Sequence, residues 1–181
     1  NQILKEYELS YDEIMAGIAG ESHDGGADSI YILVNGDLIK EDSNEKEKYK
    51  KNPDIELVII QSKKETGFGE DALLKLSRLS KNLLDLEFDR AMFAGRYNEA
   101  VLSSFELFKD TYVSLVTKRP SLSVRFFYAS MGSNVDQNVQ KQADDLIADV
   151  KLMLPASNVT VDFVGAHKLV TLSQERPNEV F

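Results

Sequence analysis

Three polar residues, Gln61, Ser62 and Lys63, end an apolar run that begins at Ile55. The run has the β-branched composition of a strand that is buried on both faces. Because strand side chains alternate between faces, Gln61 and Lys63 share the face of Ile59, and we expect them to emerge side by side where the strand reaches solvent. An amide oxygen and an ammonium delivered to one place can build a site. The alternative is a strand that ends in a hydrophilic loop, as strands commonly do.

A second set of candidate residues precedes the strand expected at 29–34. Asp24 and Asp28 flank two glycines and an alanine. Turn chemistry accounts for Asp24, because Asp favours turns. It accounts less well for Asp28, since the glycines already supply the turn. By strand alternation Asp28 shares the face of Ile30, and we expect it at the mouth of this strand, on the core face.

The elements that position these residues follow from apolar spacing and turn residues. Asn35-Gly36 predicts a hairpin whose second strand is 38–40. The spacing of helix 98–117 suits packing within the chain or, alternatively, against a second copy. Ser133 with Asp136 has the form of a capping box that opens a helix. The expected order is an N-terminal helical region, strands 29–34, 38–40 and 55–63, helices 70–86 and 98–117, strand 121–131, a helix ending at 154 and strand 158–164.

This order predicts an α/β fold with a mixed β-sheet core flanked by helices. We expect a single domain over 1–172, with a helical insertion at about 87–119 and a peripheral tail at 173–181. The mixed-charge stretch 40–54 is expected to be a solvated loop or a frayed helix. Contact of its lysines with a phosphate backbone is the alternative.

Composition excludes several classes of protein. The 181 residues include no cysteine, which rules out disulfides and thiolate metal sites and favours a cytoplasmic setting. No apolar run approaches the roughly 20 residues of a membrane span, so no membrane partner is expected. The net charge of −9 argues against broad attraction to nucleic acid, although a local carboxylate metal site can still act on a phosphodiester. His23 in a loop and His167, placed in a strand, suggest no zinc site.

Motifs of several enzyme classes are missing. The chain has no GxGxxG after its first strand, no GxxxxGK[ST] loop and no GxSxG elbow. Dinucleotide binding, P-loop phosphate binding and α/β-hydrolase chemistry therefore lose their usual sequence support.

Two stretches carry a resemblance to a known family: Asp24-Gly25-Gly26-Ala27-Asp28-Ser29-Ile30-Tyr31 and Ile59-Ile60-Gln61-Ser62-Lys63. The pattern resembles the PD-(D/E)xK nucleases, and most closely their Mrr-like branch, in which glutamine replaces the acidic residue of (D/E)xK. More narrowly, it is similar to the N-terminal region of the abortive-infection phage-resistance (AIPR) proteins. The resemblance implies a restriction-endonuclease-like fold and metal-dependent hydrolysis of nucleic acid, with DNA as the expected substrate.

The resemblance also implies roles for individual residues. Asp28, Gln61 and Lys63 are the expected catalytic residues, and Asp28, Gln61 and the backbone carbonyl of Ser62 the expected ligands of Mg²⁺ or Mn²⁺. Lys63 would hold or polarise the attacking water. No other cofactor is expected. In the family a helix glutamate often completes the site, and its position would precede Asn1. We therefore expect this chain alone to bind metal weakly and to show little or no nuclease activity. The other candidate ligands are Glu6, Glu8, Glu13 and Asp24.

Two functions from different classes follow. The first is a nuclease domain of a phage-defence protein that reaches nucleic acid through the full-length chain, with a homodimer as a further possibility. The second is a catalytically inactive module of the same fold that binds protein partners. Convergence of Asp28, Gln61 and Lys63 is the feature that separates them.

Overall fold

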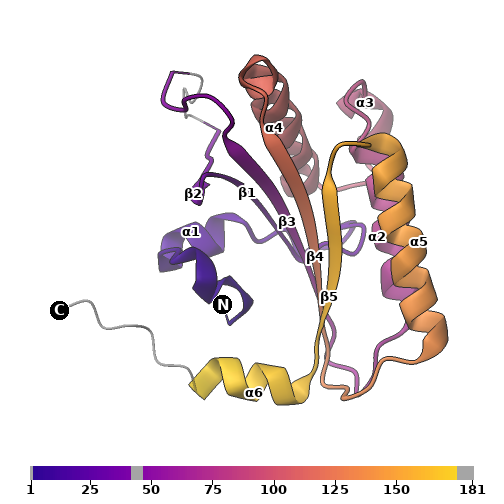
Figure 1. The fold of residues 1–181 in the computed structure, drawn as a ribbon. Coiled ribbons are helices and arrows are strands. Elements are labelled where there is room, and N and C mark those ends of the chain that lie inside the picture. The colour runs from indigo at the N-terminus through magenta and orange to yellow at the C-terminus, as the bar shows by residue number, and fades with distance from the viewer. Residues whose placement is uncertain (1, 42–46, 175–181) are drawn as a thin grey trace.

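The computed structural model describes residues 2–41 and 47–174 as an α/β structure with a five-stranded mixed sheet (Figure 1). The strands follow the order β2-β1-β3-β4-β5 across the sheet. Their bounds are β1 Ser29–Val34, β2 Asp37–Leu38, β3 Asp54–Ser62, β4 Ser121–Ala129 and β5 Asn158–Val164. The expected mixed sheet flanked by helices is thereby confirmed.

The register of the sheet divides it into two parts. β1 pairs antiparallel with β2 and β3, and Ser29 lies opposite Ile60. β3, β4 and β5 run parallel. The hairpin predicted at Asn35-Gly36 is confirmed, and both of its turn residues have positive φ, as a two-residue hairpin turn requires.

Helices cover both faces of the sheet (Figure 1). One face packs against α2 (Glu70–Leu83), α4 (Glu99–Leu115) and α5 (Gln137–Met153) and forms the larger core, which includes Ile30, Leu57 and Phe126. The short α3 (Arg90–Phe93) lies between α2 and α4 in the chain, and η2 (Val116–Lys118) follows α4. The other face packs against η1 (Ile3–Tyr7), α1 (Tyr11–Ala16) and α6 (Ala166–Gln174).

Three expectations about elements need correction. Asp136, rather than Ser133, is the N-cap of α5, and its side chain accepts a hydrogen bond from the Val139 N–H. His167 lies in α6, not in a strand, because Gly165 ends β5 and the chain turns into a helix. α6 also extends past the expected start of the tail at 173, and residues 175–181 lie outside the described residues.

The mixed-charge stretch 40–54 is described only in part, since residues 42–46 lie outside the described residues. Residues 47–53 form turns rather than a helix. The helix expected at 98–117 packs within the chain, with Phe105 and Phe108 fully buried. In the described part of the chain, no helix combines the length and apolar character of a bilayer span.

Candidate metal centre

β1 and β3 pair antiparallel as far as Ser29 and Ile60, and the residues just beyond this pair are Asp28 and Gln61. The Asp28 N–H donates to the Ile60 carbonyl at 2.8 Å, a bond one residue out of the strand register, which fixes Asp28 where the regular ladder ends. Directly opposed residues of an antiparallel pair project to the same face. The Gln61 Nε2 accordingly lies 3.1 Å from Asp28 Oδ2, on the face that packs against α2.

Ser62 and Lys63 complete the set that the sequence predicted. The Ser62 N–H donates to Asp28 Oδ2 at 2.5 Å, and the Ser62 carbonyl lies 3.4 Å from Gln61 Nε2. Lys63 is held by its own N–H, which donates to the Ala129 carbonyl of β4 at 2.9 Å. Its side chain is partly exposed, and its positive charge offsets part of the rise that burial causes in the pKa of Asp28. The structure thus brings all four predicted residues together.

The prediction that Gln61 emerges into solvent is wrong, because its side chain is 2% exposed. The glycine turn before β1 covers it: a Cβ added at Gly26 would lie 2.9 Å from Gln61 Oε1 and 3.1 Å from the Lys75 Cβ on α2. Gly26 also has φ of +92°, a conformation that disfavours any other residue. A glycine is therefore required where the turn passes over Gln61.

The Gln61 amide carries an unpaired atom. Its Oε1 is buried and has no hydrogen-bond partner among the described residues, while Nε2 faces Asp28 and Ser62. Buried polar atoms without partners are uncommon and cost free energy. Because the two ends of a side-chain amide have nearly the same shape, rotation of the amide would present the oxygen to Asp28 instead.

Asp24 is the candidate that the sequence assigned first to a turn and only as an alternative to the metal. It does make that turn, since its Oδ1 accepts the Gly26 N–H at 2.8 Å and its carbonyl accepts the Ala27 N–H at 3.1 Å. The same turn carries its carboxyl back toward Asp28, and its nearness raises the pKa of the Asp28 carboxyl. The Asp-Gly-Gly-x-Asp spacing is the signal that could have found it, because a tight turn between two carboxyls returns one toward the other.

The other candidate carboxylates lie elsewhere. Glu6 pairs with Arg125, which projects to the opposite face of the sheet beside Phe127. Glu13 closes the capping box of α1 with Ser10. Glu8 is exposed at the end of η1. The helix glutamate that the resemblance implies stays a prediction.

The electrostatics of the centre favour a cation. Burial is the largest influence on Asp28 and raises the pKa of its carboxyl, and the Asp24 carboxyl raises it further. The Ser62 N–H and the Lys63 charge lower this pKa, but the net shift is upward. Two adjacent carboxyls in a partly buried place resist being ionised together. A bound cation would relieve that repulsion.

A neighbouring helix terminus fixes the loop that carries both aspartates. Asn98, the N-cap of α4, donates through Nδ2 to the carbonyls of Ala19 at 2.9 Å and Ser22 at 3.3 Å. Its own N–H donates to the His23 carbonyl at 2.9 Å. The Ala19 N–H in turn donates to the Asp28 carbonyl at 2.8 Å. The aspartates therefore sit on a loop that is tied to the helical layer at several points.

The residues present fit a hard divalent cation. Asp24 and Asp28 supply carboxylate oxygens, Ser62 a carbonyl oxygen, and Gln61 an amide oxygen that has no other partner. Mg²⁺ prefers oxygen ligands and retains several waters, so a small protein set suffices. Residues 2–41 and 47–174 contain no cluster of three or more His, Cys, Asp or Glu side chains arranged for a metal. The centre thus depends on neutral oxygens as well as on carboxylates.

Comparison with known proteins adds no assignment. No family model matches the chain, and no match was found among curated proteins or solved structures. Any function must therefore be argued from the residues of this chain.

Proposed function

We propose that this chain is a nuclease domain of the PD-(D/E)xK type, with a restriction-endonuclease-like core and the Gln-x-Lys variant of the motif. Its reaction is hydrolysis of a phosphodiester bond in nucleic acid, with DNA as the substrate, assisted by Mg²⁺ or Mn²⁺. By the same resemblance, it belongs with the AIPR proteins of phage defence.

One observation carries the proposal: Gln61 Nε2 lies 3.1 Å from Asp28 Oδ2 and 3.4 Å from the Ser62 carbonyl oxygen. A carboxylate, a backbone carbonyl and a buried amide thus converge on one point from two strands. These are the three groups that the resemblance assigns to the metal. The unpaired Gln61 Oε1 supports the assignment, because a rotated amide would give it a partner at the ion.

Each residue has a role that its position allows. Asp28 and Gln61 hold the ion, the Ser62 carbonyl adds a third oxygen, and Asp24 contributes the second negative charge. When bound, the ion neutralises charge on the phosphate and lowers the pKa of a coordinated water.

Lys63, at the solvent end of β3, orients the attacking water and stabilises negative charge that develops on the phosphate oxygens. The water oxygen forms a bond to phosphorus, and the bond from phosphorus to the leaving oxygen breaks. The water gives up its proton to solvent, and the leaving oxygen takes one from solvent.

The test is a calorimetric titration of Mg²⁺ and Mn²⁺ into the chain and its Asp28→Asn, Asp24→Asn and Asp145→Asn variants. Asp145 is an exposed α5 residue and serves as the matched control. We expect weak binding, tighter for Mn²⁺ than for Mg²⁺. Asp28→Asn should weaken it at least about tenfold, and Asp24→Asn should weaken it less.

A plasmid-nicking assay accompanies the titration and includes Lys63→Ala. Any nicking by the wild-type chain that both Asp28→Asn and Lys63→Ala lose, without a fall in melting temperature, supports the nuclease function. Equal metal affinity in the Asp28→Asn and wild-type chains would rule it out.

A second candidate function, an interaction module, is supported by the surface of α1. Tyr11 and Met15 lie four residues apart on one side of α1 and are 67% and 47% exposed, and Ile18, just past the end of the helix, is 46% exposed. Exposed apolar stripes of this kind mark interaction sites. Light scattering of the wild-type chain and of a Tyr11→Ser/Met15→Ser variant tests whether the stripe joins two copies. A concentration-dependent dimer that the variant lacks would support this function and the proposed homodimer.

A further inference from the structure

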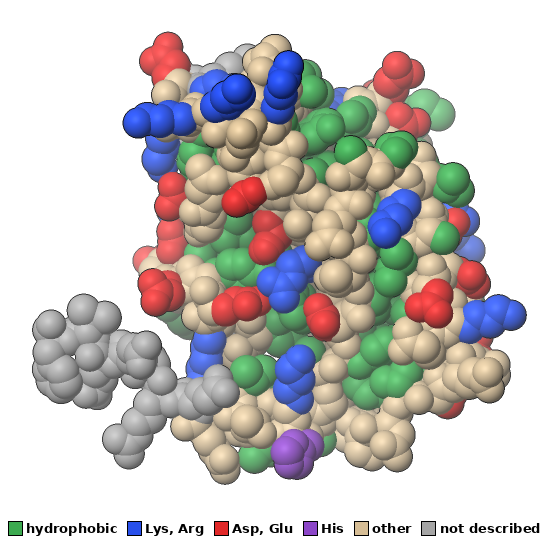
Figure 2. Space-filling model, in the orientation of Figure 1, with side chains coloured by type: hydrophobic (Ala, Val, Ile, Leu, Met, Phe, Trp, Pro, Cys, Tyr) green, Lys and Arg blue, Asp and Glu red, His purple; other side chains and the backbone are tan. Residues whose placement is uncertain are grey.

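A basic hollow lies at the end of the sheet opposite the candidate metal centre. Its volume is about 500 Å³, and its lining residues are Tyr49, Lys50, Lys51, Thr117, Lys118 and Arg119. Figure 2 shows Lys and Arg side chains gathered at the corner of the molecule where the loop before β3 meets the end of α4. We call this feature the basic hollow.

Backbone hydrogen bonds hold the two loops of the basic hollow together. The Asn52 N–H donates to the Lys118 carbonyl at 2.8 Å, and the Ser121 N–H donates to the Pro53 carbonyl at 3.0 Å. The Lys118 ammonium also donates to the Tyr49 carbonyl. Tyr49 itself is 5% exposed and belongs to the main core. The cations are therefore presented by a braced structure rather than by a loose loop.

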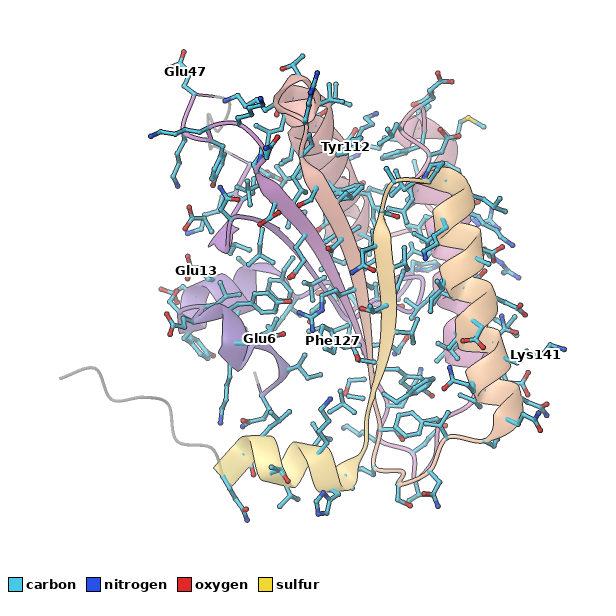
Figure 3. All side chains as sticks on the ribbon, viewed as in Figure 1. Glu6, Glu13, Glu47, Tyr112, Phe127 and Lys141 are labelled. Atoms are coloured by element: carbon cyan, nitrogen blue, oxygen red, sulfur yellow. The ribbon has the colours of Figure 1, made fainter. Side chains whose placement is uncertain are left out.

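The charge of the basic hollow opposes that of the whole chain. Four of its six lining residues are Lys or Arg and none is acidic, whereas the chain has a net charge of −9. Glu47, at the outer corner of the same loop in Figure 3, is not among the lining residues. Such a local concentration of positive charge attracts polyanions and raises their association rate.

Its position separates the basic hollow from the candidate metal centre. β3 runs nine residues from Asp54, beside the hollow, to Ser62, at the centre. At about 3.3 Å per residue the strand spans roughly 26 Å. That distance corresponds to about eight nucleotide steps along one strand of DNA at 3.4 Å each.

We propose that the basic hollow binds the phosphate backbone of nucleic acid and anchors the substrate at a distance from the metal centre. The choice of nucleic acid as the polyanion rests on the proposed function. An acidic centre on an acidic chain repels phosphate, so a separate cationic contact is needed to hold the substrate near it. Backbone phosphates carry no sequence information, and the contact therefore fixes position rather than specificity.

The experiment measures binding of a fluorescently labelled 20-nucleotide DNA, single-stranded and duplex, by anisotropy in EDTA. The chains compared are the wild type, Lys51→Glu/Arg119→Glu and Lys141→Glu. Lys141 is exposed on α5 near the opposite edge of the molecule (Figure 3), so its substitution shows the effect of a charge reversal away from the basic hollow. Lys118 is left intact because its ammonium braces the loop, and thermal melting checks that every variant is folded.

We expect the double variant to bind DNA at least about tenfold more weakly. The slope of its log affinity against log salt concentration should decrease by the amount expected for the loss of about two phosphate contacts. Lys141→Glu should bind nearly as the wild type does. The inference is overturned if Lys141→Glu loses as much DNA affinity as the double variant does. It is also overturned if the wild type binds DNA too weakly to measure at low salt. A 100-fold excess of tripolyphosphate that displaces DNA completely identifies a small-anion site instead, and also overturns it.

Failure of the inference can be told apart from failure of the proposed function. Binding in EDTA and in an Asp28→Asn background requires no metal, so it reports on the basic hollow alone. If metal binding depends on Asp28 but DNA binding does not depend on Lys51 and Arg119, the nuclease function remains supported. The proposed role of the basic hollow in binding DNA is then contradicted.

Discussion

Two polar clusters occupy opposite faces of the sheet and differ in how their charges are satisfied. On the face beneath η1, Glu6, Tyr7, Glu56 and Arg125 form what we call the arginine cluster. Arg125 donates to Glu6 at 2.9 Å and to the Tyr7 hydroxyl at 2.6 Å and lies 3.8 Å from Glu56. The Tyr7 hydroxyl donates to Glu56 at 2.7 Å. Glu6 and Phe127, both labelled in Figure 3, each contact Arg125 on this face.

The arginine cluster is closed, whereas the candidate metal centre is open. In the former, one guanidinium contacts both carboxylates, and burial together with Glu56 raises the pKa of Tyr7 so that its hydroxyl remains a donor. In the latter, two carboxyls face each other and the Gln61 Oε1 has no partner. A closed cluster stabilises the fold, while an open one leaves capacity for a ligand.

Among these predictions, Gln61→Glu should have the largest effect on stability, and it changes the open candidate metal centre rather than the closed arginine cluster. In EDTA it adds a buried charge beside two carboxyls and should lower the free energy of unfolding by about 3 kcal/mol. With Mn²⁺ the added carboxylate becomes a ligand, and the stability should recover. Urea denaturation with EDTA or MnCl₂ measures both states. Gln137→Glu, at an exposed position in the first turn of α5, is the control for added charge. If the Gln61→Glu variant is as stable as the wild type in EDTA, the description of the candidate metal centre as open is contradicted.

Arg125→Met tests the closed cluster. It leaves Glu6 and Glu56 without their shared cation and should destabilise the fold by about 2 kcal/mol, less than for a fully buried pair because these side chains are partly exposed. Urea denaturation measures the loss, and metal affinity should not change. Arg78→Met, at an exposed position of α2, should be nearly neutral. A large change in metal affinity would show that the two faces are coupled.

Tyr7→Phe also tests the arginine cluster, and we expect it to lower stability less than Arg125→Met does. It removes one hydroxyl that donates to Glu56 and accepts from Arg125, and should cost about 1 kcal/mol. Thermal melting detects this loss. Tyr11→Phe, whose ring is 67% exposed, is the matched control and should leave the melting temperature unchanged.

Asp28→Asn should produce the smallest stability change, and one of opposite sign. The folded state raises the pKa of Asp28, so its contribution is favourable below the pKa of the unfolded chain and is lost as pH rises through the folded value. Asn carries no charge, so the variant should gain stability relative to the wild type over that rise. Melting temperatures between pH 3 and pH 8 measure the difference. If the Asp28→Asn variant loses stability relative to the wild type as pH rises, the pKa of Asp28 is lowered rather than raised in the folded state.

Sequence reasoning reached the local features of the site. The alternation of side chains placed Asp28 and Gln61 on the core face, and the register of β1 and β3 confirms that placement. The hairpin at Asn35-Gly36 followed from turn chemistry alone. These features depend on neighbours within one strand or one turn.

The features that sequence reasoning missed depend on distant parts of the chain. The burial of Gln61 results from the Gly26 turn and from α2, neither of which is adjacent to it in sequence. The ties from Asn98 to the aspartate loop join positions more than 70 residues apart. Asp24 was assigned to its turn correctly and was only an alternative ligand, because its nearness to Asp28 depends on how the turn returns its carboxyl.

The pairing of β1 with β3 also ties the candidate centre to the folding of the chain. Asp28 and Gln61 are 33 residues apart, and only the correct register sets them opposite each other. A slip of one residue would turn Gln61 to the other face, beneath η1. A collapsed chain with secondary structure but wrong register would therefore bind no ion at this place. During refolding, the appearance of metal affinity would report native strand register rather than compaction.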